Sequence, residues 1–122
     1  MAAPSFRREQ IGHLLRDTIS EVLGELTNSW AQLATVTDVV LAPDGHSAQV
    51  FFTALCEPEQ IAEVEEALNS AAGYIRKLVT EALSLRVVPA LHFVRDEQGE
   101  QAARLDRLLR QIQSEEASGG SH

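Results

Sequence analysis

Apolar residues recur at the three- and four-residue spacing of one helical face from residue 58 to about residue 85, which predicts a long amphipathic helix. The stripe consists of Ile61, Val64, Leu68, Ala71, Ala72, Ile75, Leu78, Val79 and Ala82. It continues straight through Gly73, although a glycine inside a helix costs about 1 kcal/mol relative to alanine and helices often bend at such residues. We therefore expect two helical halves bent at Ala72-Gly73, with one straight helix and a tolerated glycine as the alternative.

Three short segments have the composition of strands. Residues 34–41 are rich in β-branched side chains, residues 47–55 alternate between apolar and polar, and residues 90–95 follow Pro89, which ends any helix. Pro43-Asp44-Gly45 lies between the first two segments and is strong turn chemistry, so these two segments are predicted to form a β-hairpin.

A first helix is predicted from Phe6 to Leu26 by an apolar stripe, with Gly12 and Arg16 on the side opposite to it. Thr27 to Leu33 is predicted to be a polar linker. The amphipathic stretch from Leu105 to Ile112 is short and is expected to be helical only when docked. The predicted order is α-β-β-α-(kink)-α-β, an α+β fold in which helices cover one face of a three-stranded sheet.

At 122 residues, with 44% hydrophobic and 23% charged residues, the chain is expected to form one domain with its own core. This domain is predicted to span residues 1–113, and residues 114–122, which end in Ser-Gly-Gly-Ser-His, are predicted to be a disordered tail. Cys56 is the only cysteine, and no signal peptide or membrane-length apolar run is seen, so we expect a cytoplasmic protein. The four histidines show no zinc spacing, and neither a metal nor a cofactor is predicted.

The charge is distributed unevenly along the chain. A net charge of −8 argues against a simple polyanion-binding surface. Residues 73–95 are the exception, because four cations (Arg76, Lys77, Arg86 and Arg95) stand against one acid, Glu81, which leaves +3. This positive segment begins at the predicted kink. The positive end of the second half-helix, with Arg76 and Lys77 one turn later, is therefore a candidate phosphate-binding site.

The first helix offers further positive charge. Arg7, Arg8 and Arg16 are candidates for the same basic surface. The acidic residues of that helix favour the alternative, in which these arginines are solvent-exposed helix residues that do not contact RNA.

Three segments, taken together and in order, resemble the ribosome-binding factor A family: VTDVVLAPDGHSAQVFF, ALNSAAGYIRKLV and LSLRVVPALHFVRDE. The resemblance covers roughly Phe6 to Leu109 and implies a KH-like fold of the second, α-first topology. In that family an Ala-x-Gly helix kink replaces the usual Gly-x-x-G nucleic-acid loop, and the kink falls here on Ala71-Ala72-Gly73. The chain departs from the family at residues 27–30, which are Thr-Asn-Ser-Trp where the family usually has an Asp-Pro-Arg-like connection, and in its acidic tail.

Residue roles follow from the resemblance by position. Arg76 belongs to the RNA-facing motif, Arg86 matches the family's Leu-Arg-x-x-Pro, and Asp96 matches the acidic residue after the last strand. Together with the local charge, this predicts an RNA-contacting set consisting of Arg7, Arg8, Arg16, Ala71, Ala72, Gly73, Arg76, Lys77, Arg86 and Arg95. Because Arg76 and Lys77 are both assigned to the polar helix face, replacing them is expected to leave the melting temperature nearly unchanged.

The resemblance implies a non-catalytic, monomeric assembly factor for the small ribosomal subunit. Such a factor binds 16S rRNA in immature 30S particles, promotes late maturation including 5′-end processing, and matters most in the cold. Its partners would be 16S rRNA and the 30S subunit, with an assembly GTPase left open and no membrane involved.

Two other functions are weighed against this one. The first is a protein-interaction module without RNA, in which the acidic helix face from Glu57 to Glu66 and Trp30 form the contact surface. The second is a small enzyme or ligand sensor that uses Asp44, His46 and Arg76, although no spacing in the sequence brings these three together.

Overall fold

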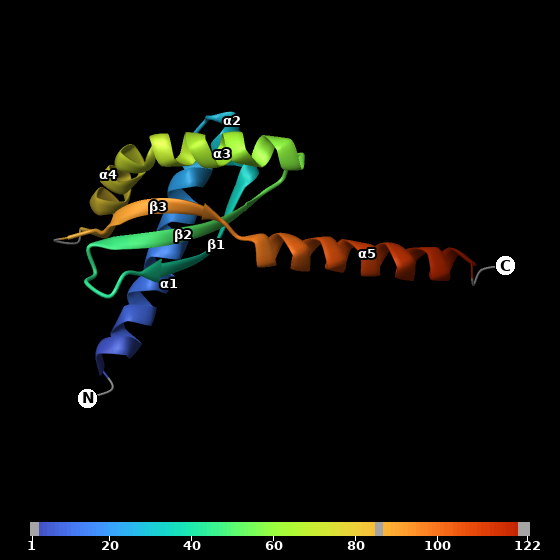
Figure 1. Ribbon diagram of the computed structural model, residues 1–122, viewed down its shortest axis with the longest axis horizontal. Coiled ribbons are helices and arrows are strands. Elements are labelled where there is room, and N and C mark those ends of the chain that lie inside the picture. Colours follow the sequence, from blue (N-terminus) through green and yellow to red (C-terminus); the bar gives the residue numbers. More distant parts are fainter. Residues whose placement is uncertain (1–2, 85–86, 120–122) are drawn as a thin grey trace.

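The helices and strands follow the predicted order, with one short helix and one long helix in addition (Figure 1). A computed structural model describes residues 3–84 and 87–119. Its elements are α1 (Ala3–Glu25), α2 (Ser29–Leu33), β1 (Ala34–Leu41), β2 (Ser47–Ala54), α3 (Pro58–Ser70), α4 (Ala72–Leu83), β3 (Ala90–Arg95) and α5 (Glu97–Gly119).

The three strands form one mixed sheet in the order β1-β2-β3, in which β1 pairs antiparallel with β2 and β2 pairs parallel with β3. The register of the first pair shifts between Val36 and Asp38, so Thr37 is an extra residue in β1. The predicted turn is confirmed. The Asp44 carboxylate accepts the backbone N–H of His46 at 2.9 Å, and Gly45 has a φ of 74°.

The core lies on one face of this sheet, beneath α1, α3 and α4, as predicted. Its largest fully buried side chains are Phe52, Phe93, Leu15, Ile19, Leu68, Ile75, Val50 and Val79. On the opposite face Thr35, Val40, Gln49 and His92 are exposed. Alternation along each strand therefore divides a buried face from a solvated one.

Helix α1 corrects the prediction made for Gly12. This residue is buried rather than on the solvated side, and a β-carbon built on it would lie 2.8 Å from the carbonyl oxygen of Val39 in β1. The absence of a side chain allows the backbones of α1 and β1 to approach closely at this point. The hydrophobic pattern did not indicate this, because glycine has no apolar side chain to count.

The predicted linker from Thr27 to Leu33 contains α2, in which Ala31 is buried and Trp30 packs half-buried against the core. A short helix can form here because its apolar side chains pack against the core. Helix propensity alone does not predict such packing.

Helix α5 is much longer than the predicted stretch from Leu105 to Ile112, and it crosses the predicted boundary at residue 114 and continues to Gly119. Figure 1 shows it extending away from the rest of the domain. Two carboxylates, Glu97 and Glu100, lie in its first turn, where they stabilise the positive end of the helix. Within the residues that the structure describes, no helix is long and apolar enough to cross a membrane.

Candidate nucleic-acid interface

The predicted kink is present and is centred on Ala71. Helix α3 ends at Ser70, Ala71 has φ −91° and ψ 0°, and α4 begins at Ala72. Figure 1 shows α4 turning away from the direction of α3. The bend therefore begins one residue before the predicted Ala72-Gly73 pair.

Asn69, two residues before the bend, holds the last turn of α3 against β3. Its side-chain Nδ2 donates to the carbonyl of Phe93 at 3.0 Å, and its Oδ1 accepts the N–H of Phe93 at 2.8 Å. One turn earlier, a carboxylate oxygen of Glu65 accepts the N–H of Arg95 at 3.2 Å. Side chains of α3 thus satisfy backbone groups on the outer edge of β3, which protects that edge from other strands. Asn69 is not among the residues predicted from the sequence, where its only sign is an amide beside the apolar stripe and next to the kink.

The first turn of α4 presents backbone donors without partners in the helix. Its first bond runs from the N–H of Ile75 to the carbonyl of Ala71 at 2.9 Å, so the N–H groups of Ala72, Gly73 and Tyr74 precede the hydrogen-bond ladder. Ala71 has no side-chain oxygen with which to cap them. Gly73 and Tyr74 are exposed, and a β-carbon on Gly73 would meet nothing within 4 Å. These open donors at the positive end of a helix suit a phosphate group.

The two cations after the bend differ in what they contact. Arg76 donates from Nε and from Nη2 to the carbonyl of Val88, at 2.9 and 2.6 Å, and Val88 itself is buried. It therefore links α4 to Val88, two residues before β3. Lys77 is exposed, and among the described residues its side chain makes no hydrogen bond or ion pair. Both residues are exposed, as expected for the polar helix face, but Arg76 also donates to the buried Val88 whereas Lys77 has no such contact among the described residues.

Several predicted residues gather at the hairpin end of the molecule. Arg8 donates to the carbonyl of Pro43 in the hairpin turn at 2.9 Å, and the N–H of Ala90 donates to the carbonyl of His46 at 3.0 Å. The first half of α1, the hairpin turn, the start of β3 and α4 therefore lie near one another (Figure 1). Arg7 is exposed on the same part of α1.

Arg16 and Arg95 lie apart from this end. Arg16 is eight residues beyond Arg8 on α1, about 12 Å along the axis, and its Nε is 3.3 Å from the carboxylate of Asp17. Arg95 is at the far end of β3, about 17 Å along the strand from Ala90, and forms a 3.2 Å ion pair with Glu100. The hydrogen bonds that Arg95 donates to the carboxylate of Glu100 raise the pKa of Arg95. Arg86, the remaining predicted contact, lies outside the described residues.

The residues of the two alternative functions are largely engaged elsewhere. The carboxylate of Asp44 is used by its own turn, and Trp30 is half-buried. On the acidic face of α3, Glu65 binds β3, whereas Glu59 and Glu63 are exposed. Across the described parts of the chain, no group of three or more His, Cys, Asp or Glu is arranged to hold a metal ion.

An α-first order, a mixed three-stranded sheet and a helix bend in place of a Gly-x-x-G loop define a KH-like α+β domain. A sequence model of ribosome-binding factor A matches residues 7–109. The chain therefore belongs to the ribosome-binding factor A family, as the resemblance predicted.

Individual relatives agree with this assignment. Ribosome-binding factor A of Thermomicrobium roseum is 39% identical over 113 residues, which cover 92% of this chain and 88% of the relative. A Thermotoga maritima protein described as a ribosome binding factor A, solved by solution NMR, is similar with a TM-score of 0.65 and 27% identity over 77% of this chain and 91% of that one. A homology model of Thermus thermophilus ribosome binding factor A, fitted into a cryo-EM map of its complex with 30S, gives a TM-score of 0.54 and 25% identity, covering 66% and 86% of the two chains.

Proposed function

We propose that this protein is an assembly factor of the small ribosomal subunit, which binds 16S rRNA in immature 30S particles and promotes late maturation, including 5′-end processing. The observation that carries the proposal is the open first turn of α4, where backbone donors at a helix N-terminus are followed by the exposed Lys77. The Thermus thermophilus relative, which was fitted into a complex with 30S, supports the same class of partner.

In this proposal the surface around the bend binds the phosphate backbone of rRNA. The N–H groups of Ala72, Gly73 and Tyr74 donate to phosphate oxygens, and Lys77 adds a mobile positive charge. Arg76 holds Val88 against α4. Arg7 and Arg8 extend the positive surface along α1. Such a surface positions a protein on RNA without reading bases, so recognition of the particle depends on RNA shape.

We infer that the protein acts by binding alone, as a monomer in the cytoplasm, with its greatest importance in the cold. An assembly GTPase is the candidate for a cooperating partner. The groups around the bend are donors and cations, which favours stabilisation of an rRNA conformation over cleavage of RNA.

Sedimentation tests the proposal. The purified chain is centrifuged with free small subunits, free large subunits and whole ribosomes at two salt concentrations. Co-migration with free small subunits that weakens steeply at higher salt is the expected result, because phosphate contacts depend strongly on salt. Absence of co-migration with any of these particles would overturn the proposal.

A further inference from the structure

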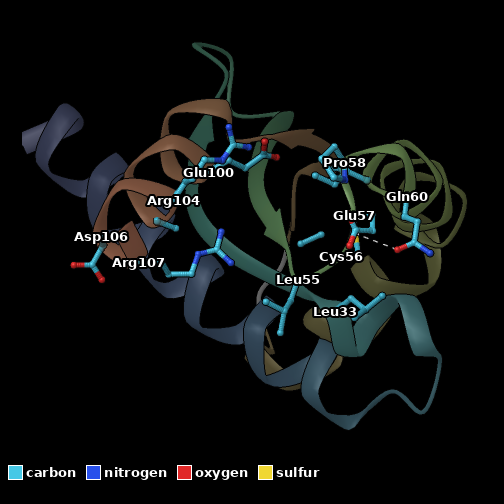
Figure 2. Close-up of a pocket in the computed structure, with 13 residues that line it drawn as sticks. Leu33, Leu55, Cys56, Glu57, Pro58, Gln60, Glu100, Arg104, Asp106 and Arg107 are labelled. Atoms are coloured by element: carbon cyan, nitrogen blue, oxygen red, sulfur yellow. Dashed lines mark hydrogen bonds between the residues drawn. The ribbon is translucent and has the colours of Figure 1, made fainter. Parts of the chain in front are cut away.

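A groove lies between α5 and the segment that joins β2 to α3, with a volume of about 1030 Å³ (Figure 2). One side is mostly apolar and is formed by Leu33, Ala54, Leu55 and Ile61. Leu55 is 77% exposed, which is high for a leucine at the rim of a groove. The opposite side comes from α5. An exposed apolar surface at the edge of a groove is typical of a surface that a partner covers.

The side of the groove formed by α5 carries two arginines. Arg104 and Arg107 both line the groove, and Figure 2 shows Arg107 directed from α5 toward the side where Leu55 lies. Neither arginine forms an ion pair within 4 Å among the residues that the structure describes. Arg110, by contrast, is paired with Asp106 at 3.1 Å.

The carboxylates around the groove are already compensated. Glu100 is paired with Arg95 and is largely buried, and Asp106 is paired with Arg110. Glu57 stands at the N-terminus of α3, whose positive end offsets its charge. The charge that remains available to a ligand is therefore positive, although the whole chain carries −8.

The two sides of the groove are held in fixed relation by contacts at the start of α5. The carboxylate of Asp96 accepts the N–H of Gly99 at 2.8 Å and the hydroxyl of Thr37 in β1 at 2.6 Å. The ion pair of Arg95 with Glu100 adds a second link between β3 and α5. These contacts set the direction in which α5 leaves the sheet, so the groove exists before any ligand arrives.

We propose that this groove binds an acidic segment of a partner protein in which aliphatic side chains accompany carboxylates. Aliphatic groups fit the side formed by Leu33, Leu55 and Ile61, and carboxylates pair with Arg104 and Arg107. RNA fits less well, because unstacked bases prefer aromatic side chains and none of the 13 lining residues is aromatic.

The groove is separate from the surface proposed to bind rRNA. It lies beside the first turn of α3, whereas the bend follows the last turn, about 20 Å away along a 13-residue helix. The inference therefore does not depend on the proposed function, and the two can fail independently.

The test is an NMR titration of the full chain with a short synthetic peptide in which Leu and Glu repeat at helical spacing. Two control peptides replace every Glu by Lys or every Leu by Ser. Shifts centred on Leu33, Leu55, Cys56 and Arg107, seen with the first peptide and not with the controls, are expected. No shift at millimolar peptide, or shifts centred on the bend at Gly73, would overturn the proposal.

Matched variants make the result specific. Arg107→Glu should weaken binding of the Leu–Glu peptide by about tenfold or more, since it places a negative charge against the ligand. Lys77→Glu makes the same change of charge at an exposed position of α4, beyond the bend and outside the groove, and should have little effect on binding of the peptide. Equal losses in both variants would show non-specific attraction and overturn the proposal. The proposal would also be overturned if the chemical shifts of groove residues changed with protein concentration alone, because a second copy of the chain would then occupy the groove. Shifts caused by an RNA oligonucleotide but not by the peptide would likewise overturn it.

Discussion

The amide of Asn69 forms a two-way pair with the backbone of Phe93, donating at 3.0 Å and accepting at 2.8 Å across 24 residues of sequence. The pair takes the place of a neighbouring strand along the outer edge of β3. It also positions the last turn of α3, after which the chain bends at Ala71. The place of the bend in the molecule thus depends on one side chain that contacts a strand.

Replacing Asn69 by alanine should lower the free energy of unfolding by about 1–3 kcal/mol, because the partly buried N–H and carbonyl of Phe93 lose their partners. Urea denaturation followed by circular dichroism measures this loss. Ser70→Ala, at the exposed neighbouring position, serves as the control and should change stability little. Equal stability of the two variants would show that the pair with Phe93 is unimportant.

Two glycines of α1 should respond in opposite ways to alanine. Gly12→Ala should destabilise the fold by about 1–3 kcal/mol, because the new β-carbon would lie 2.8 Å from the carbonyl of Val39 and α1 would have to move away from β1. Gly24→Ala adds a β-carbon with nothing within 4 Å and should stabilise the helix by about 0.5–1 kcal/mol. Thermal unfolding of both variants checks the difference in sign. A mild effect at Gly12 would mean that α1 and β1 are not in close contact.

Arg76 and Lys77 should separate stability from binding. Arg76→Glu removes both donors to the buried carbonyl of Val88, so it should lower stability by about 1–3 kcal/mol. Lys77→Glu should leave the melting temperature nearly unchanged and weaken binding to small subunits several-fold. The slope of the logarithm of the binding constant against the logarithm of the salt concentration should become shallower by about one unit. Melting curves and sedimentation at several salt concentrations measure the two effects. Normal binding by Lys77→Glu would remove this lysine from the interface.

Gly73→Ala tests the backbone donors of α4. Its folded state should be stabilised by about 0.5–1 kcal/mol, since the site is open and Gly73 does not have a positive φ. Binding to small subunits should nevertheless fall, because a β-carbon stands where a phosphate would approach the backbone. Stability and binding are measured on the same preparation. Unchanged binding would argue against a phosphate at this turn.

Cys56, in the groove beside α5, should react slowly with alkylating reagents at neutral pH. Burial raises the pKa of its thiol above the ordinary value, and the negative charge of Glu57 raises it further. A raised thiol pKa in the folded state stabilises the fold below the unfolded pKa, and this contribution is lost as pH rises through the folded value. The rate of reaction with iodoacetamide is followed from neutral to alkaline pH. It should begin to rise at a higher pH than the rate for a free cysteine peptide. A rate profile equal to that of the peptide would contradict the shift.

Much of the fold follows from local patterns. Spacing of three and four residues indicated α1, α3 and α4. β-Branched composition, alternation and the helix-ending Pro89 indicated β1, β2 and β3 in turn, and Pro43-Asp44-Gly45 indicated the hairpin turn. The bend near Gly73 was also visible, because the apolar stripe crosses a residue that weakens a helix. These features depend on residues within a few positions of one another, and such interactions can be seen in a sequence.

The other features are decided by contacts between distant residues. Gly12 is buried because α1 crosses β1 at Val39, Arg76 is engaged because the chain returns to it at Val88, and Arg95 is paired with the first turn of α5. The start of α5 is positioned by Asp96, whose carboxylate accepts the hydroxyl of Thr37 across 59 residues of sequence and the N–H of Gly99. From the sequence, a charged residue or a glycine shows only which contacts its residue type can make. The tertiary structure decides what it does, because the partner that satisfies or constrains it comes from elsewhere in the chain.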